Sequence, residues 1–178
     1  MNMNWELSEY AAQSPPISYD AMWDTIFKYH DIITPFLYHD EYIMVFNGQP
    51  GTGKTWAAWA TIDSYHKMVF TGHSEFIEWS ELCVIILDRN RNDNYGCEAR
   101  SKLAALKRAD ILVIDDFCES HFDDMHHIHS IINNRFNNKM RTLFVTSRSD
   151  NEIEHIIGTS ISERLKSSIV INFTDVIR

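Results

Sequence analysis

An eight-residue stretch that begins at Gly48 constrains the fold of this chain more than any other feature. It reads Gly48-Gln-Pro-Gly-Thr-Gly53-Lys54-Thr55 and matches the pattern G-x-x-x-x-G-K-[ST] at every fixed position. Glycines let the backbone approach a polyphosphate closely, and the N–H groups of the loop and of a following helix can point at it. We therefore expect Lys54 to neutralise the β- and γ-phosphates of a nucleotide and the Thr55 hydroxyl to ligate Mg²⁺.

The segments on either side of the loop predict the surroundings that such a loop requires. The apolar run 42–46 is typical of a strand, and a helix is expected from Lys54 to about Phe70. Four further apolar runs predict strands, at residues 76–79, 111–114, 142–146 and 169–173. Helical patterns lie between them, from Ser80, over 98–108, from Phe122 to Phe136 and on both sides of Gly158. This alternation predicts an α/β fold, a P-loop NTPase whose five-stranded parallel sheet is flanked by helices.

The length of the chain and the composition of its N-terminus predict one domain preceded by an arm. A length of 178 residues is that of a single compact domain. Residues 1–19 are polar and interrupted by Pro15-Pro16, so we interpret them as an extended arm and residues 20–178 as the nucleotide-binding domain. From Asp20 apolar residues recur at helical spacing, and Pro35 is expected to end that helix.

Charge and cysteine content exclude several classes of protein. Lysine and arginine number 16 and aspartate and glutamate 25, so the net charge is 16 − 25 = −9. This charge argues against a surface that binds duplex DNA throughout, although not against a local basic patch. The three cysteines form no C-x-x-C pair, which favours reduced thiols. No apolar run approaches the ~18 residues of a membrane span, and no signal-peptide pattern begins the chain. We therefore expect a cytoplasmic protein without a membrane partner.

A pair of acids is expected where a buried strand ends. The run Ile111–Ile114 is apolar throughout, as in a strand covered on both faces, and Asp115 and Asp116 follow it directly. Such a strand delivers carboxylates to the sheet edge at which the phosphate loop lies, which is the Walker B arrangement. We expect Asp115 to hold Mg²⁺ through water and Asp116 to orient the attacking water.

Five segments, taken in order, resemble one family of ATPases. They are Gly-Thr-Gly-Lys-Thr at 51–55, Ala-Asp-Ile-Leu-Val-Ile-Asp-Asp at 109–116, Ile-Ile-Asn-Asn-Arg-Phe at 131–136, Leu-Phe-Val-Thr-Ser at 143–147 and Ile-Ser-Glu-Arg-Leu at 161–165. The chain resembles, over roughly residues 42–173, the DnaC/IstB group of AAA+ ATPases, the helicase loaders and transposition helpers. The resemblance implies that 20–178 is an AAA+ ATPase domain that self-assembles, binds single-stranded DNA and engages a replicative helicase or a transposase. Since five residues follow Phe173, we expect no C-terminal lid domain.

The resemblance also implies roles for individual residues. In the family an arginine on a short helix before the last strand reaches the ATP of the next subunit, and Arg164 matches it, so catalysis is assigned to Lys54, Asp116 and Arg164. The family ends its fourth strand with Thr-Ser-Asn, whose Asn senses the γ-phosphate, whereas Arg148 follows Ser147 here. We call Ser147 and Arg148 the sensor residues and expect slow hydrolysis. The residues expected to contact ATP are Gly48, Gln49, Pro50, Gly51, Thr52, Gly53, Lys54, Thr55, Trp56, Ser147 and Arg148.

Two basic segments are candidate sites for other ligands. Residues 88–108 carry six cations against three acids, a surplus of 6 − 3 = +3, and Tyr95 could stack a base. Arg89 and Arg91 are therefore candidates for binding single-stranded DNA, the alternative being an ordinary solvated loop. Arg135 belongs to a second basic cluster and is a candidate for a subunit interface or a phosphate.

These observations predict an ATP-binding AAA+ protein that acts in DNA replication as a helicase-loader-like switch. ATP and Mg²⁺ are the expected cofactors, hydrolysis is expected to be slow, and nucleotide-dependent homo-oligomers are expected to form. A replicative helicase or another replication or transposition protein is the expected partner. Two alternatives are a nucleotide-binding adaptor with little or no turnover, of the transposition-helper type, which Arg148 favours, and a small-molecule P-loop kinase.

Overall fold

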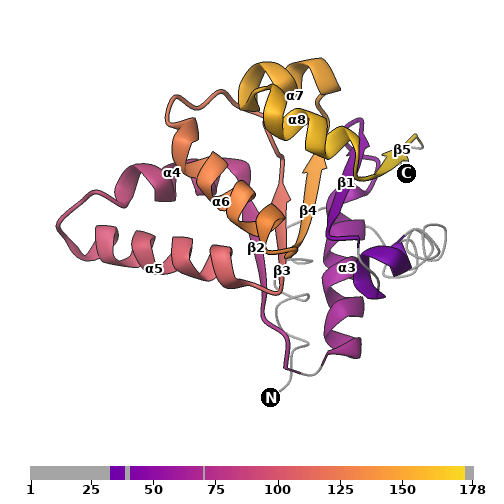
Figure 1. Ribbon diagram of the computed structural model, residues 1–178, viewed down its shortest axis with the longest axis horizontal. Coiled ribbons are helices and arrows are strands. Elements are labelled where there is room, and N and C mark those ends of the chain that lie inside the picture. The colour runs from indigo at the N-terminus through magenta and orange to yellow at the C-terminus, as the bar shows by residue number, and fades with distance from the viewer. Residues whose placement is uncertain (1–32, 39–40, 70, 175–178) are drawn as a thin grey trace.

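A five-stranded parallel sheet forms the centre of the molecule (Figure 1). The computed structural model describes residues 33–38, 41–69 and 71–174. The strands are β1 (Ile43–Gly48), β2 (Ser74–Glu78), β3 (Ile111–Asp115), β4 (Arg141–Thr146) and β5 (Ile169–Phe173). Their spatial order is β2-β3-β4-β1-β5, and every neighbouring pair is parallel. The predicted α/β fold and five-stranded parallel sheet are confirmed, whereas the arm 1–19 and residues 20–32 of the first predicted helix lie outside the described residues.

Helices cover both faces of the sheet because the connection from β1 to β2 crosses the sheet in one direction and the later connections cross it in the other. They are α3 (Lys54–Met68), α4 (Trp79–Asp88), α5 (Asn94–Arg108), α6 (Met125–Asn137), α7 (Asp150–Ile157) and α8 (Thr159–Lys166). Parallel crossovers are right-handed, so α3, which leads outward from β1 to β2, packs on one face. Helices α4 to α8 belong to the returning connections and lie on the other face (Figure 1). No helix in the described part of the chain is both long enough and apolar enough to cross a membrane.

Two hydrophobic clusters hold the sheet between its helices and bury the strand ends that form the site. On β1, Met44 and Phe46 face α3, whereas Val45 faces the opposite layer. Strand β3 is buried at every position, as predicted for a strand covered on both faces. Asp115, its last residue, is only 3% exposed. Parallel strands end at a common edge, so the chain ends of β1, β3 and β4 meet beside this buried carboxylate.

Two predicted helix boundaries are wrong because apolar burial overrides the local signal. Residues 33–38 stay helical through Pro35, which was expected to end a helix. Phe36 is fully buried among the side chains of α3 and β1, and this packing offsets the hydrogen bond that a proline removes. Phe122, expected to begin a helix, is instead buried in the loop before α6, which starts at Met125.

Two further helices begin earlier than predicted. The first residue of one is anchored by burial, and the residue before the other caps it. Helix α4 begins at Trp79 rather than after a cap at Ser80, since the Trp79 indole is itself buried and its N–H donates to the chain beyond β3. Helix α5 begins at Asn94 instead of about residue 98, because Asp93 caps it by accepting a hydrogen bond from the N–H of Gly96.

Candidate functional site

The loop between β1 and α3 has the backbone geometry of a phosphate cradle. Gly51 and Gly53 have φ angles of 81° and 86°, in the left-handed region that glycine adopts at least cost. A side chain is excluded at Gly48, because a Cβ there would lie 2.3 Å from the carbonyl oxygen of Phe173. Lys54 Nζ donates to the Gly48 carbonyl oxygen at 2.6 Å and to the next carbonyl oxygen at 2.9 Å. The ammonium group therefore lies inside the loop.

The other side chains of the loop fix its turn and leave its outer edge exposed. Thr52 is buried, and its hydroxyl donates to the carbonyl oxygen of Gln49 at 2.8 Å. Gln49 and Pro50 are exposed, and Trp56 is half-buried in the first turn of α3. The Lys54 ammonium therefore lies against the first two residues of the loop, Gly48 and Gln49.

Strand β3 brings two carboxylates to this loop. Asp115 accepts a hydrogen bond from the Thr55 hydroxyl. The N–H of Asp116 donates to Asp115 Oδ1 at 2.9 Å, and Asp116 has a φ of 48°, a sparsely populated value for a residue with a side chain. From there the chain enters a turn, residues 116–120, in which the N–H of Phe117 donates to a carbonyl oxygen of β4 at 2.8 Å. The two side chains predicted to ligate Mg²⁺, Thr55 and Asp115, are therefore in contact.

Burial shifts the pKa values of Asp115 and Lys54 in directions that fit a cation bound at the site. Burial raises the pKa of Asp115 to about 6, although hydrogen bonds from Thr55 and from the Asp116 N–H oppose the shift. Burial lowers the pKa of Lys54, and the charges of Asp115, Asp116 and Glu119 oppose that shift. A divalent cation beside the Asp115 carboxylate and the Thr55 hydroxyl would supply the compensation that water no longer gives. Both groups are oxygen ligands of the kind that Mg²⁺ prefers, so the predicted metal fits these residues.

Replacing Asp115 by asparagine should stabilise the protein when Mg²⁺ is removed. The folded-state pKa of about 6 lies above the ordinary value of 3.8, so the folded protein binds the proton more tightly than the unfolded chain. The parent's unfolding free energy should therefore rise as the pH falls from about 7 to about 4. Asparagine keeps the acceptor oxygen without the charge, and at neutral pH it should add about 1–3 kcal/mol. Urea unfolding with a chelator at both pH values measures this; equal stability of the two proteins at neutral pH would contradict it.

The end of β4 lies between the phosphate loop and the turn 116–120. Thr146 is the register partner of Asn47, the residue before the loop. The Thr146 hydroxyl donates to the carbonyl oxygen of Phe117 at 2.8 Å and accepts from the N–H of Arg148 at 3.0 Å. The structure thus places the sensor residues, Ser147 and Arg148, beside the two other segments of the site.

Glu119 belongs to this site and was missed by the sequence interpretation. Its carboxylate accepts a hydrogen bond from the Ser147 hydroxyl and pairs with Arg148 Nη2 at 3.1 Å. Arg148 also donates to the carbonyl oxygen of Glu119 at 2.7 Å and, through Nη1, to Glu152 at 3.1 Å. Both sensor side chains are therefore bound to carboxylates of the protein itself. The sequence feature that could have indicated Glu119 was its position, an acidic residue three places after Asp116.

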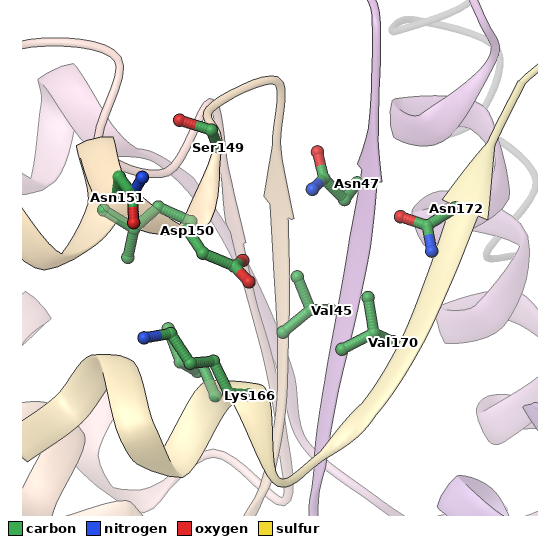
Figure 2. Close-up of a pocket in the computed structure, with 10 residues that line it drawn as sticks. Val45, Asn47, Ser149, Asp150, Asn151, Lys166, Val170 and Asn172 are labelled. Carbon is green, nitrogen blue, oxygen red and sulfur yellow. The ribbon is translucent and has the colours of Figure 1, made fainter.

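A cavity of about 640 Å³ opens next to the site, on the face of the sheet that carries α7 and α8. Figure 2 shows Asn47 of β1 and Asn172 of β5 around it, together with Asp150 of α7 and, from the same two strands, Val45 and Val170. Asn47 and Asn172 are register partners, and each follows its valine by two residues, so the four side chains share one face. The sequence interpretation did not find this cavity, which adjoins the first glycine of the phosphate loop.

Arg164 lies toward the opposite end of β1. It is exposed on α8, where Nη1 donates to Asn133 Oδ1 at 3.2 Å and the guanidinium lies 5.3 Å from the centroid of the Phe136 ring. With Tyr42 and Ile43, at the start of β1, it lines a second cavity of about 400 Å³. The phosphate loop begins five residues beyond Ile43, roughly 16 Å along the strand. The structure therefore does not bring Arg164 to the phosphate loop of its own chain.

Arg135 serves neither an interface nor a phosphate, so that prediction is wrong. Its side chain is fully buried. It donates hydrogen bonds to Thr142 Oγ1 at 2.9 Å and to the carbonyl oxygens of Leu106 and Ala109, both at 2.8 Å, and of Arg141 at 2.6 Å. Burial lowers the pKa of Arg135 to about 10, with the charge of Asp110 opposing the shift, so the guanidinium stays charged at neutral pH. Its role is to join α5, α6 and β4.

The arginines of the basic loop before α5 are paired with acids of the protein itself. Arg89 Nη2 pairs with Asp124 at 2.9 Å, and only 12% of the Arg89 side chain is exposed. Arg91 pairs with Asp93 at 2.7 Å and lies over the ring of Tyr95, 5.0 Å from its centroid. The side chains proposed to bind single-stranded DNA are therefore already paired, Arg89 with Asp124 before α6 and Arg91 within the loop, which favours the alternative of an ordinary solvated segment.

The sheet order, the phosphate loop after β1 and the acids at the end of β3 define a parallel α/β fold of the P-loop type. No family model and no curated protein sequence matches the chain. Among solved structures it is similar to the DnaC helicase loader (TM-score 0.67, 18% identity, 91% of this chain and 93% of that one). It is also similar to DnaI (TM-score 0.67, 18% identity, 84% and 81%) and to the replication initiator DnaA bound to AMPPCP and single-stranded DNA (TM-score 0.67, 14% identity, 83% and 46%).

These similarities confirm the fold that the sequence resemblance implied. The chain spans about half the length, 46%, of the replication initiation factor and of two DnaA structures that it matches, and nearly the full length of the DnaC loader. At identities of 18% and below, the similarity shows the fold alone. The activity and the partners of this chain are therefore proposals.

Proposed function

We propose that this chain binds ATP with Mg²⁺, hydrolyses it slowly, and acts in DNA replication as a helicase-loader-like switch that assembles with ATP and single-stranded DNA. The observation that carries the proposal is the convergence of three segments at one sheet edge: the phosphate loop after β1, the acids after β3 and the sensor residues after β4. The similar structures include a helicase loader and a DnaA bound to AMPPCP and single-stranded DNA, which supports a role in replication. The partner would be a replicative helicase or another replication or transposition protein.

Each group at this edge has a task that its position supports. The loop N–H groups and the Lys54 ammonium bind phosphate oxygens, and Lys54 exchanges its present carbonyl partners for them. Thr55 and Asp115 would hold Mg²⁺, which supplies charge neutralisation at the β- and γ-phosphates. Asp116 lies one residue beyond the buried strand, where its carboxylate accepts a hydrogen bond from the attacking water and orients it.

Replacing Lys54 by alanine should lower ATP affinity at least about tenfold, because a charged hydrogen bond contributes roughly 1.5–3 kcal/mol. Asp116→Asn is the comparison variant, since it changes the water-side acid and leaves the loop intact. It should keep the ATP affinity of the parent and lose phosphate release. Calorimetric titration with ATP and Mg²⁺ and a phosphate-release assay measure the two quantities.

Either variant can overturn its own assignment. Parent-like ATP affinity in Lys54→Ala would refute the phosphate-loop assignment. Parent-like hydrolysis in Asp116→Asn would refute the role of this acid and leave nucleotide binding standing.

The ion pairs of Arg148 favour a second candidate function, a nucleotide-binding adaptor with little or no turnover. Its guanidinium is held between Glu119 and Glu152, so the cation at the sensor position is already paired. Phosphate release measured with and without single-stranded DNA separates the two functions, because a loader-like switch should release phosphate and an adaptor should not. Phosphate transfer to nucleosides or nucleoside monophosphates would instead indicate a small-molecule kinase.

A further inference from the structure

Glu119 occupies a position that the turn 116–120 builds for it. The N–H of Glu119 donates to the carbonyl oxygen of Asp116 at 3.0 Å, which closes the turn. Cys118, immediately before it, is buried and has a φ of 63°, a second left-handed residue in this short segment. The turn directs the Glu119 carboxylate back toward the end of β4, where it meets both sensor residues. One carboxylate thus links the chain beyond β3 to the chain beyond β4.

The negative charge of Glu119 is close enough to the phosphate loop to act on Lys54. Its carboxylate is one of three, with Asp115 and Asp116, whose charges act on the Lys54 ammonium. A phosphate in the loop would therefore be repelled by Glu119 and attracted by Lys54. It would also be attracted by the Arg148 guanidinium once that group is no longer paired with Glu119.

The present contacts of Arg148 are incomplete. Nη2 is bound to Glu119 and Nη1 to Glu152, whereas Nε is buried without a hydrogen-bond partner among the described residues. A buried donor without an acceptor is costly, so a different orientation of the guanidinium can gain a bond that this one lacks. An anion on the phosphate-loop side offers such an acceptor.

We propose that Glu119 is a positioning residue that holds Arg148 against the turn 116–120 and away from the terminal phosphate, so that ATP must compete with Glu119 for this guanidinium. The inference rests on the proposed function, because it assigns to that site a built-in competitor for the γ-phosphate. ADP lacks the phosphate that would exchange with the carboxylate. The pair therefore controls the preference for ATP over ADP.

Replacing Glu119 by glutamine tests this inference through the ratio of ADP to ATP-analogue dissociation constants. Glutamine keeps an acceptor for Ser147 and removes the charge that holds Arg148. The ratio should shift toward ATP by about threefold to tenfold, as expected when a charged hydrogen-bond acceptor becomes neutral. A fold defect would weaken both nucleotides alike and leave the ratio unchanged. Calorimetric titration with ADP and with a non-hydrolysable ATP analogue measures it.

Two further variants separate the arginine from simple repulsion by Glu119. In an Arg148→Ala background, Glu119→Gln should no longer shift the ratio, because the guanidinium that it releases is gone. Glu152→Gln removes the other carboxylate from Arg148 and should shift the ratio less than Glu119→Gln, since the hold of Glu119 remains. An unchanged ratio in Glu119→Gln, or the full shift in the Arg148→Ala background, overturns the inference. If the parent binds neither nucleotide, the proposed function fails and this inference fails with it.

Discussion

Replacing Arg135 by alanine is expected to lower the unfolding free energy by about 3–5 kcal/mol, because each buried acceptor left without its donor costs about 1–3 kcal/mol. The guanidinium is fully buried and donates four hydrogen bonds. Three of its acceptors are carbonyl oxygens, two at the end of α5 and one in β4, and alanine would leave them buried without donors. Because most domains of this size are stable by only about 5–15 kcal/mol, this loss removes a large part of the total.

The planar set of donors on the Arg135 guanidinium, and not its charge alone, accounts for the expected loss of stability. Arg135→Lys keeps the charge but offers one ammonium group in place of a planar set of donors, so it should recover only part of the loss. Arg108→Ala is the control, because Arg108 is exposed at the end of α5 and its removal should change stability by less than about 0.5 kcal/mol. Urea unfolding followed by circular dichroism measures all three variants, and a parent-like midpoint for Arg135→Ala would contradict the assigned role.

The phosphate loop and the Asp115–Asp116 pair could be predicted because contiguous residues carry their signals. The glycines of the loop are required by their own backbone angles, and Gly48 by its approach to β5. The acids follow an apolar run that is buried on both faces, so their place at the sheet edge follows from the strand. The five strands and α3 were predicted for the same reason, since a short apolar run or a helical spacing of apolar residues is visible over a short stretch.

The roles of Glu119, Arg148 and Arg135 could not be predicted because they depend on contacts between distant segments. Glu119 meets Arg148 only because the chain turns back at Asp116 and Cys118, two residues with side chains in left-handed conformations that composition does not indicate. Arg135 belongs to a residue type that is mostly exposed, so exposure was the natural expectation. Its burial follows from the carbonyl oxygens of α5 and β4, which the sequence does not show to be neighbours.

Arg164 can act on ATP only from a neighbouring subunit if the proposed function holds. It lines a cavity with Tyr42 and Ile43 at the start of β1, whereas the phosphate loop follows the end of that strand. Its contacts with Asn133 and Phe136 hold the guanidinium on the surface of α6 and α8. The phosphate loop and Arg164 therefore lie toward opposite ends of the sheet, and joining them between copies is a heterologous contact that generates a ring or an open spiral.

Arg164→Ala should still bind ATP, because its own phosphate loop is intact, and should lose both assembly and phosphate release. Lys54→Ala should bind ATP at least about tenfold more weakly and keep an intact Arg164. In an equal mixture of the two variants, roughly a quarter of the contacts pair an intact loop with an intact arginine, so about that fraction of parent activity should return. Lys67→Ala, which removes an exposed lysine near the end of α3, is the control and should assemble and hydrolyse like the parent. Sedimentation and phosphate release with ATP and single-stranded DNA measure the outcome. Normal activity of Arg164→Ala alone, or a mixture as inactive as its components, would show that this arginine does not complete a neighbour's site.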